Sequence, residues 1–509
     1  MRSGLLRRRL DGSALLSTMI ALFILTSGMV LILAQVGDAV RMNRKQRSAA
    51  AAFNLAESGA ELGVLWLRKQ AYPPTDTTDI TPFGGAQNLG EGTYTVTITP
   101  YESNKTAYLK KFRVTGTGIV RQERKKVEIV VQQASFGRYA YFTDQELTVT
   151  GSPIQWRTGD TVDGPAHSNN SNGTIFNITY TGSSPIFLDK LTAVGTSINY
   201  SPSAPTNEAT FKKVFKNGSQ GYQLGVPYIP LPTSSDVQRN AAWGASGGFP
   251  GSNGVYLRAD NDGGIYIRGD AAIKLSVNAS GDQVIEVTQG SNVTKLTMNR
   301  ATKSITTTGP VGSGSAKSAS SLGTGVIYCT GNITSLQGEV ADNRVVNGEI
   351  AVRSELTIAT DVNAGKNIEI TGNLVYRTRP DKTLDPSASV NLRAGTLGLV
   401  ARNTTIDKNA PSNLEIDAVT MSGGENLSDG SFSVENYSSK TPTGKLKVLG
   451  GIIQKKRGAV GTFNSSTGAM ISGYEKDYIY DPRLATNPPP FFPTTGTYER
   501  LSWRLVGGN

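Results

Sequence analysis

The stretch richest in groups suited to acid–base chemistry is TGDTVDGPAHSNN, residues 158–170. It holds the one histidine of the chain, His167, with Asp160 and Asp163 before it and Asn169 after it. A histidine held by a carboxylate is a common general base. The same letters also describe a turn-rich loop in which His167 and Asn169 hydrogen-bond the backbone. We favour the loop.

Paired carboxylates and the single cysteine offer the remaining chemistry. Asp381 and Asp385 lie in RPDKTLDP and form the best pair for glycoside hydrolysis, which needs two carboxyl groups, but no histidine lies near them. Cys329 occupies the inner apolar position of IYCTG, so we expect a buried thiol. RADNDGG, residues 258–264, offers oxygen ligands for calcium but is also ordinary turn sequence. We therefore predict no enzyme activity, no metal and no cofactor.

A long helix precedes all of these residues. Residues 13–70 contain no proline, and no charge lies between Asp11 and Asp38. An apolar run of about 20 residues crosses a bilayer, and the sequence continues as an amphipathic helix. Arginine at position 2 and at 7–9 predicts a cytoplasmic N-terminus. The chain is thus expected in the inner membrane by this single helix, with its body outside the cytoplasm.

Charge and composition limit the classes of partner. The net charge is +11, but the first 70 residues hold ten basic and four acidic side chains, and the body is nearly neutral. Nucleic acid is therefore not expected as a partner. The basic residues between 105 and 126 are typical of a solvated sheet edge, with DNA or partner docking as the alternative. One Cys and one His exclude a disulfide framework and a Cys/His zinc cluster.

Three alternating runs follow a polar linker at 71–92. They are TYTVTITPY (93–101), KKFRVTGTGIV (110–120) and KKVEIVVQQ (125–133). Alternation of apolar and polar residues is typical of half-buried strands, and the short VRQERKKVE turn favours a hairpin. We predict a small antiparallel sheet over 93–135, folded against the emergent part of the helix.

The body at 136–473 contains short strands separated by Gly, Asn and Ser turns. A strand-then-Gly pattern recurs as LTVTG (147–151), IYIRG (265–269), IYCTG (327–331), IEITG (368–372) and LKVLG (446–450), with further candidates at 354–360, 397–406 and 414–421. The last four are separated by 62, 41 and 78 residues, near multiples of about 20, the length of one solenoid coil. The sequence predicts a mainly β protein with a right-handed parallel β-helix or solenoid-like body, and β-sandwich domains are the alternative.

Two segments of the body are expected to be irregular. Residues 230–252 are predicted as a surface excursion with a short helix around 234–243. Residues 474–509 contain NPPPFFP and are predicted as an extended arm that covers an end of the solenoid, because proline cannot occupy a regular helix or a central strand.

The leader and helix carry a family resemblance. A basic leader (1–12) that ends in Gly12 before an apolar helix resembles a type IV prepilin signal, and QRSAAAAFNLAESGAELG (46–63) is similar to the PilX-type minor pilins. The resemblance implies cleavage between Gly12 and Ser13 by a prepilin peptidase, with methylation of the new N-terminus. Most pilins carry Glu at the fifth mature position, where this chain has Ser17, as in large minor pseudopilins proposed for filament tips.

Small residues let helices approach closely, and the resemblance implies a helix packed among other pilin helices. The predicted filament-packing positions are Ala49, Ala52, Ala56, Glu57, Gly59, Ala60 and Gly63. A stalk packed on its own domain is the alternative.

The expected function is a minor pilin-like structural subunit of a type IV pilus or related filament, acting in assembly, tip capping or surface adhesion. The expected partners are other major and minor pilins, prepilin peptidase and the inner-membrane assembly platform. The alternative is a membrane-anchored β-helix that binds or cleaves extracellular polysaccharide.

Overall fold

Two compact units make up the protein. The computed structural model describes residues 8–70, 74, 78–105, 108–171, 176–245, 247–441, 444–464 and 469–507. The first unit comprises Met1–Gln132 and Tyr498–Asn509, and the second comprises Gln133–Thr497. Residues 1–7 of the predicted leader and positions 71–73 and 75–77 of the predicted linker lie outside the described residues.

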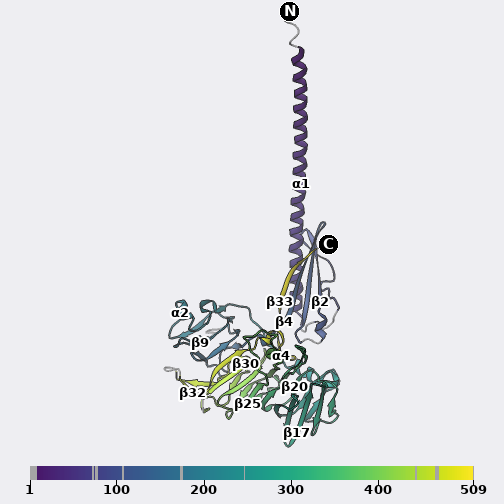
Figure 1. The fold of residues 1–509 in the computed structure, drawn as a ribbon. Helices are drawn as coiled ribbons and strands as arrows, with labels where there is room; N and C mark the ends of the chain where they lie inside the picture. Colours follow the sequence, from purple (N-terminus) through teal and green to yellow (C-terminus); the bar gives the residue numbers. More distant parts are fainter. Residues whose placement is uncertain are drawn as a thin grey trace, which may run out of the picture. The chain divides into compact units, whose positions relative to one another are not determined.

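A single helix, α1 (Arg8–Arg68), dominates the first unit (Figure 1). The continuous helix is confirmed, and it begins at Arg8 rather than at residue 13. Its sequence contains no proline, so no backbone donor is lost along its length. Figure 1 shows its N-terminal half standing clear of the sheet and its C-terminal half lying beside β2 (Gly92–Pro100).

The predicted small antiparallel sheet is confirmed. Its strands run in the order β1 (Gln87–Leu89), β2, β3 (Lys111–Val120), β4 (Glu123–Ser135) and β33 (Thr494–Val506). The β3–β4 hairpin turns at Arg121, whose φ of 55° is left-handed. The end of the predicted linker forms β1, which pairs antiparallel with β2.

The edge strand β33 corrects the predicted arm over 474–509. Its residues from Tyr498 onward belong to the first unit, where Tyr498 packs edge-on against Phe112. The arm is also wrong at its start, because β32 (Met470–Tyr480) is a strand with a partner on each side. The prolines that motivated the arm lie between these two strands, where they interrupt no ladder.

The second unit is built mainly from parallel ladders. One ladder pairs, in spatial order, β14 (Ile265–Arg268), β20 (Val326–Cys329), β24 (Glu355–Thr360), β26 (Thr396–Ala401), β28 (Leu414–Ser422), β30 (Gly444–Lys456), β5 (Tyr141–Gln145), β8 (Ala166–Ser168), β10 (Leu191–Ala193) and β12 (Tyr222–Leu224). Another pairs β15 (Ala271–Val277), β21 (Ile333–Val340), β25 (Ile368–Tyr376), β28, β30, β32 and β7 (Thr161–Asp163), and β25 also continues into β27 (Thr404–Ile406) and β29 (Phe432–Val434).

Smaller elements decorate these ladders. Antiparallel partners are β13 (Gly254–Leu257), β16 (Gln283–Gln289), β17 (Asn292–Asn299), β18 (Ser304–Thr308), β19 (Ser318–Ala319) and β31 (Gly461–Phe463). Separate sheets are β22 (Arg344–Val346) with β23 (Glu349–Val352), and β6 (Gln155–Arg157) with β9 (Phe176–Thr179) and β11 (Ile198–Ser201). The short helices are α2 (Glu208–Phe211), α3 (Asp236–Trp243), α4 (Ser389–Arg393) and α5 (Arg483–Thr486).

The predicted coil length of about 20 residues does not hold throughout the body. Gly398 pairs with Val419, a step close to one coil of about 20 residues. Ile265 instead pairs with Ile327, because the β16–β18 meander is inserted between them. The LTVTG segment at 147–151 is a turn rather than a strand. The other repeats and the three further candidates coincide with strands.

Asparagine side chains hold successive turns in register. The backbone N–H of Asn367 donates to Asn332 Oδ1 at 3.0 Å, and that of Asn403 donates to Asn367 Oδ1 at 3.1 Å. The N–H of Ser431 then donates to Asn403 Oδ1 at 3.0 Å. This ladder satisfies backbone donors that the turns would otherwise leave unpaired.

The β14–β20–β24–β26 sheet is buried on both faces, as its apolar sequences require. One face points into the main core through residues such as Ile327 and Leu399. The other face, which includes Tyr328, is covered by α3 through Ala242 and Trp243. The helix predicted around 234–243 is therefore confirmed. The predicted surface excursion is wrong in part, since α3 covers apolar sheet surface.

The coarse prediction of a mainly β chain with one long N-terminal helix and a small antiparallel sheet is confirmed. A right-handed parallel β-helix stays a prediction.

Candidate functional site

The helix α1 meets its sheet along a seam of alanine and glycine. Ala52, Ala56 and Ala60 are fully buried at intervals of about one turn. On β3, a Cβ added to Gly116 would lie 2.0 Å from the carbonyl oxygen of Ala56, and one on Gly118 would lie 2.1 Å from that of Ala52. Helix and strand backbones touch here, and only glycine leaves room for that contact.

Most of the predicted filament-packing positions are used within the chain itself. Ala52, Ala56, Gly59, Ala60 and Gly63 are buried in the first unit, whereas Ala49 and Glu57 are partly exposed. The prediction is therefore wrong for the five buried positions, because side chains covered by their own sheet cannot contact another subunit. Small side chains permit close approach to any neighbour, and the nearest one is the sheet. For Ala49 and Glu57 filament packing stays a prediction.

The N-terminal half of α1 presents apolar surface on all sides. From residue 14 to residue 47 every side chain is exposed except at Gly28, and Phe23 and Leu25 are 73% and 71% exposed. Apolar surface of this extent requires a membrane or a partner to cover it. The helix is long and apolar enough to cross a membrane. Gly12 and Ser13 lie within α1, and cleavage between them stays a prediction.

His167 lies in strand β8 rather than in a loop, and it is 1% exposed. Its Nδ1 is 2.8 Å from Thr192 Oγ1, and its Nε2 is 3.1 Å from Asn169 Oδ1. Asn169 in turn donates to the carbonyl oxygen of Ile229 at 2.6 Å and to Asp144 Oδ1 at 3.1 Å. Burial lowers the pKa of His167 to about 4, so the imidazole is neutral at neutral pH. The network links β8 to β10 through Thr192, and to Asp144 of β5 and the backbone of Ile229 through Asn169.

The two aspartates of the same motif have other partners. Asp160 is buried and accepts from Lys476 Nζ at 2.7 Å, and burial lowers the pKa of that lysine. Asp163 forms an ion pair with Lys382. Neither contacts His167 by a hydrogen bond or ion pair in the described part of the chain, so the motif is a structural network in which no acid–base pair is assembled.

Asp381 and Asp385 each close a turn of their own. Asp381 Oδ1 accepts from the backbone and hydroxyl of Thr383, and Asp385 Oδ1 accepts from those of Ser387. These hydrogen bonds lower the pKa of both carboxyls. The buried amide of Asn391 holds the loop by donating to the carbonyl oxygens of Asp381 and Asp385. The pair shows none of the raised pKa that a catalytic acid needs.

A cavity of about 300 Å³ lies beside this loop. Its walls are mainly apolar, and among the residues that line it are Leu384, Pro386, Ile479, Tyr480 and Pro482. Its cationic residues are already paired: Arg379 with Glu415, Lys382 with Asp163, and Arg483 with Asp481. The cavity thus offers an apolar surface to a ligand, and each of its described cations already has an acidic partner.

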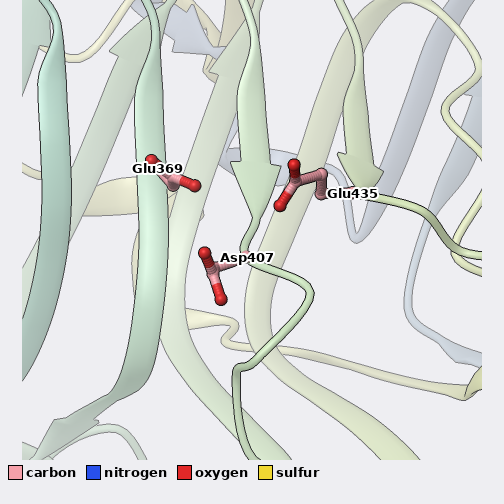
Figure 2. A group of neighbouring side chains, drawn as sticks. All are labelled: Glu369, Asp407 and Glu435. Atoms are coloured by element: carbon pink, nitrogen blue, oxygen red, sulfur yellow. The ribbon is translucent and has the colours of Figure 1, made fainter. Parts of the chain in front are cut away.

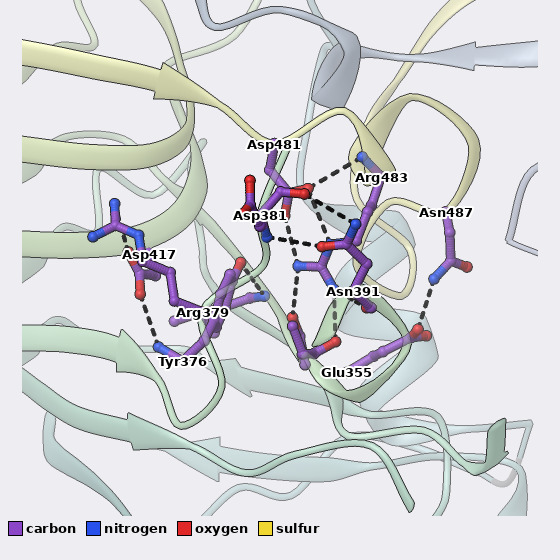
Figure 3. Close-up of polar contacts among 12 residues, drawn as sticks. Glu355, Tyr376, Arg379, Asp381, Asn391, Asp417, Asp481, Arg483 and Asn487 are labelled. Carbon is purple, nitrogen blue, oxygen red and sulfur yellow. Dashed lines mark hydrogen bonds and ion pairs between the residues drawn. The ribbon is translucent and has the colours of Figure 1, made fainter. Parts of the chain in front are cut away.

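Arg483 anchors the start of α5 in a buried network (Figure 3). Its Nε and Nη2 donate to the two oxygens of Asp481 at 3.0 and 2.6 Å, the bidentate geometry that suits arginine. Nη1 and Nη2 also donate to the carbonyl oxygens of Ala394 and Gly395 at 2.6 and 3.1 Å. Burial is the largest single influence and lowers the pKa of Arg483, but Asp481, Tyr376 and Glu355 together raise the pKa above its ordinary value.

Asp417, from β28, lies near this network with one oxygen poorly satisfied. Its Oδ2 accepts from the backbone N–H of Tyr376 at 3.0 Å, whereas Oδ1 has no hydrogen bond and lies 3.9 Å from Arg379 Nη2. Burial raises the pKa of Asp417 to about 6. Nothing in the sequence around Asp417 distinguishes it from other strand aspartates.

Three carboxylates that were not predicted from the sequence lie together on adjacent strands (Figure 2). Glu369 belongs to β25, Asp407 follows β27 and Glu435 follows β29; their ligand oxygens lie within 4.8 Å of one another. Burial, followed by the charges of Asp407 and Glu435, raises the pKa of Glu369. The sequence feature that could have revealed this cluster is the acidic residue in each of IEIT, TTID and FSVE, three segments that stack in register. Carboxylate oxygens suit Ca²⁺, but exposed acidic groups are common without an ion.

Two further predicted positions have structural roles. Cys329 is buried, its Sγ lies 3.1 Å from the carbonyl oxygen of Gly269, and burial raises the pKa of its thiol to about 12. Asp260 accepts from the backbone and hydroxyl of Ser320, which ties the 258–264 loop to a distant turn.

No family model and no curated protein matches this chain. Among the solved structures that match is the crystal structure of the competence-associated pilin ComZ from Thermus thermophilus. The two share 12% identity over 90% of this chain and 98% of that chain, with a TM-score of 0.26. A likeness at that TM-score carries no argument about fold or function.

Proposed function

We propose that this chain is a non-enzymatic, minor pilin-like subunit of a type IV pilus or related filament, acting in assembly, tip capping or surface adhesion. The observation that carries the proposal is the division of α1 into two halves. The C-terminal half is packed on the chain's own sheet, and the N-terminal half exposes apolar surface from residue 14 to residue 42. A membrane covers that surface before assembly, and neighbouring pilin helices cover it afterwards.

The remaining parts fit this role. The anchor lies in the inner membrane, and the body is displayed outside the cytoplasm as a right-handed parallel β-helix. The parallel ladders and the asparagine ladder through Asn332, Asn367 and Asn403 support a stacked body. The partners are other pilins, a prepilin peptidase that cleaves between Gly12 and Ser13, and the assembly platform. The absent glutamate at Ser17 supports a position at the filament tip.

The proposal is tested by the mature N-terminus, determined by mass spectrometry in cells with and without prepilin peptidase. We expect a peptidase-dependent start at Ser13, methylated, and its loss in a Gly12→Val variant. Gly4→Val is the matched control, because it changes a leader glycine away from the scissile bond. An uncleaved N-terminus in both strains would refute entry into the pilin pathway and favour the anchored, polysaccharide-binding alternative.

Filament packing is tested separately by a photo-crosslinking amino acid on α1. At Leu31, which is 62% exposed, we expect crosslinks to another pilin helix in assembled filaments. At Ala56, which is fully buried, we expect crosslinks within the chain only. If neither position gave a crosslink to another subunit, a place in the filament would be contradicted.

A further inference from the structure

The surface of α1 becomes basic where its contact with the sheet ends. Ala60, Ala56, Ala52, Ser48 and Arg44 follow one another at every fourth position, in a row that winds around the helix by about 40° per step. The alanines are fully buried, Ser48 is 8% exposed and Arg44 is exposed. The row therefore changes from small to cationic at the point where α1 leaves its own unit's sheet.

The β3–β4 hairpin adds a second source of positive charge at this level. Its turn residues Arg121 and Gln122 are exposed, and with Arg44, Lys45, Ser48 and Glu123 they line an open groove of about 440 Å³. We call these six residues the basic groove. Within the described residues no ion pair involves Arg44, Lys45 or Arg121, and Glu123 is the one carboxylate among the lining residues.

The basic groove follows directly on the apolar surface of the helix. Val40 is the last apolar residue before Arg41, and Arg44 lies one turn further. Side chains on a helix lean toward its N-terminus, so these cations lean toward the apolar half. The rise from Val36 to Arg44 is about 12 Å. That distance is close to the screening length of about 8–10 Å in physiological salt.

We infer that the basic groove binds the phosphate groups of anionic phospholipids in the outward-facing leaflet and so sets the depth of the subunit in the membrane before assembly. This inference rests on the proposed membrane anchoring of α1. A lipid phosphate is favoured over other anions because the groove and the apolar surface share one unbroken helix. Whenever the apolar half is inserted, the groove is held at the bilayer surface at high local concentration of headgroups.

The test uses the full chain in nanodiscs of phosphatidylcholine with about 30% phosphatidylglycerol. A donor fluorophore is placed at Asn88→Cys, an exposed position on β1 outside the groove, and Cys329 does not compete for label because it is buried. Trace acceptor is supplied as acyl-labelled phosphatidylglycerol or acyl-labelled phosphatidylcholine. If anionic lipid gathers at the groove, energy transfer to labelled phosphatidylglycerol exceeds energy transfer to labelled phosphatidylcholine.

The variant Arg44→Gln, Lys45→Gln, Arg121→Gln removes the three cations. We expect the excess transfer to labelled phosphatidylglycerol to disappear in this variant, because each cation contributes about five-fold to the preference of the groove for anionic over neutral lipid. The excess transfer of the unmodified groove should fall as salt rises from about 50 to about 500 mM. The matched control Lys216→Gln, Lys303→Gln, Lys317→Gln removes three exposed cations of the second unit and should keep the enrichment.

The outcomes separate the inference from the proposed anchoring. Equal transfer to both acceptors in nanodiscs that carry the inserted chain would overturn the inference while leaving the anchor intact. A chain that never co-purifies with nanodiscs would overturn both. Binding of duplex DNA or an acidic protein to the groove, with no lipid enrichment, would also overturn the inference. The surface would then be assigned to that class of partner.

Discussion

Replacing Gly116 by alanine tests the closest contact in the first unit. The added Cβ would lie 2.0 Å from the carbonyl oxygen of Ala56 and 2.6 Å from the backbone nitrogen of Ala60, where ordinary contacts begin at 3.4 Å. Both obstacles are helix backbone and cannot rotate away. The helix must withdraw by about 1 Å or more, and a gap of that size forfeits a quarter to a half of each dispersion contact along the seam. We expect a cost of about 3 kcal/mol, the upper end for overpacking.

The assay is hydrogen exchange by mass spectrometry on the full chain in detergent, followed at the amides of β3. A cost of about 3 kcal/mol raises exchange through opening of the unit by about two orders of magnitude. Peptides from the second unit serve as an internal reference, because their exchange should not change.

The matched control is Thr115→Ala, which alters the neighbouring residue on the opposite face of the same strand. Its side chain is partly exposed, and its effect should stay within about 0.5 kcal/mol. If Gly116→Ala exchanged no faster than Thr115→Ala, the helix and β3 backbones would not be in contact and the account of the seam would be wrong.

Two further predictions concern buried ionisable groups in the second unit. Arg483→Met leaves Asp481, whose side chain is 0% exposed, without its bidentate partner, and should cost about 3–5 kcal/mol in calorimetric unfolding; Arg483→Lys should lose less, and an unchanged melting temperature would contradict the network. His167 has its pKa held near 4 in the folded protein against an ordinary 6.5, so the unfolded chain binds more protons between those values. Stability should therefore fall by up to about 3 kcal/mol as pH drops from 6.5 to 4. Denaturant midpoints measured across this window should vary less in His167→Gln, and equal slopes in both proteins would refute a buried neutral histidine.

Sequence patterns correctly predicted those helices and strands that are specified by residues close together in the chain. The proline-free run after Asp11 specifies α1, and the alternation in 110–120 and 125–133 specifies the β3–β4 hairpin. Burial of Cys329 follows from its inward position in a strand. Each of these depends on residues within one element or one turn.

Features set by distant partners escaped prediction. The sequence of residues 494–506 does not indicate that they form the edge of a sheet whose other strands lie hundreds of residues earlier. The apolar outer face of β20, through Tyr328, required a cover, but the sequence alone did not identify α3 as that cover. The carboxylates of Glu369, Asp407 and Glu435 meet only because three strands stack in register, and register is a property of the assembled ladders.

The return of the chain through β33 has a consequence for protein engineering. The strands β4 and β33 are neighbours, and the backbone N–H of Phe136 donates to the carbonyl oxygen of Pro493 at 3.1 Å, so the chain leaves and re-enters at nearly one point. Everything between these two residues behaves as a cassette inserted into a hairpin. A cassette of this kind can be exchanged, enlarged or reduced to a short turn by design, while the helix and its sheet keep their own closed set of contacts.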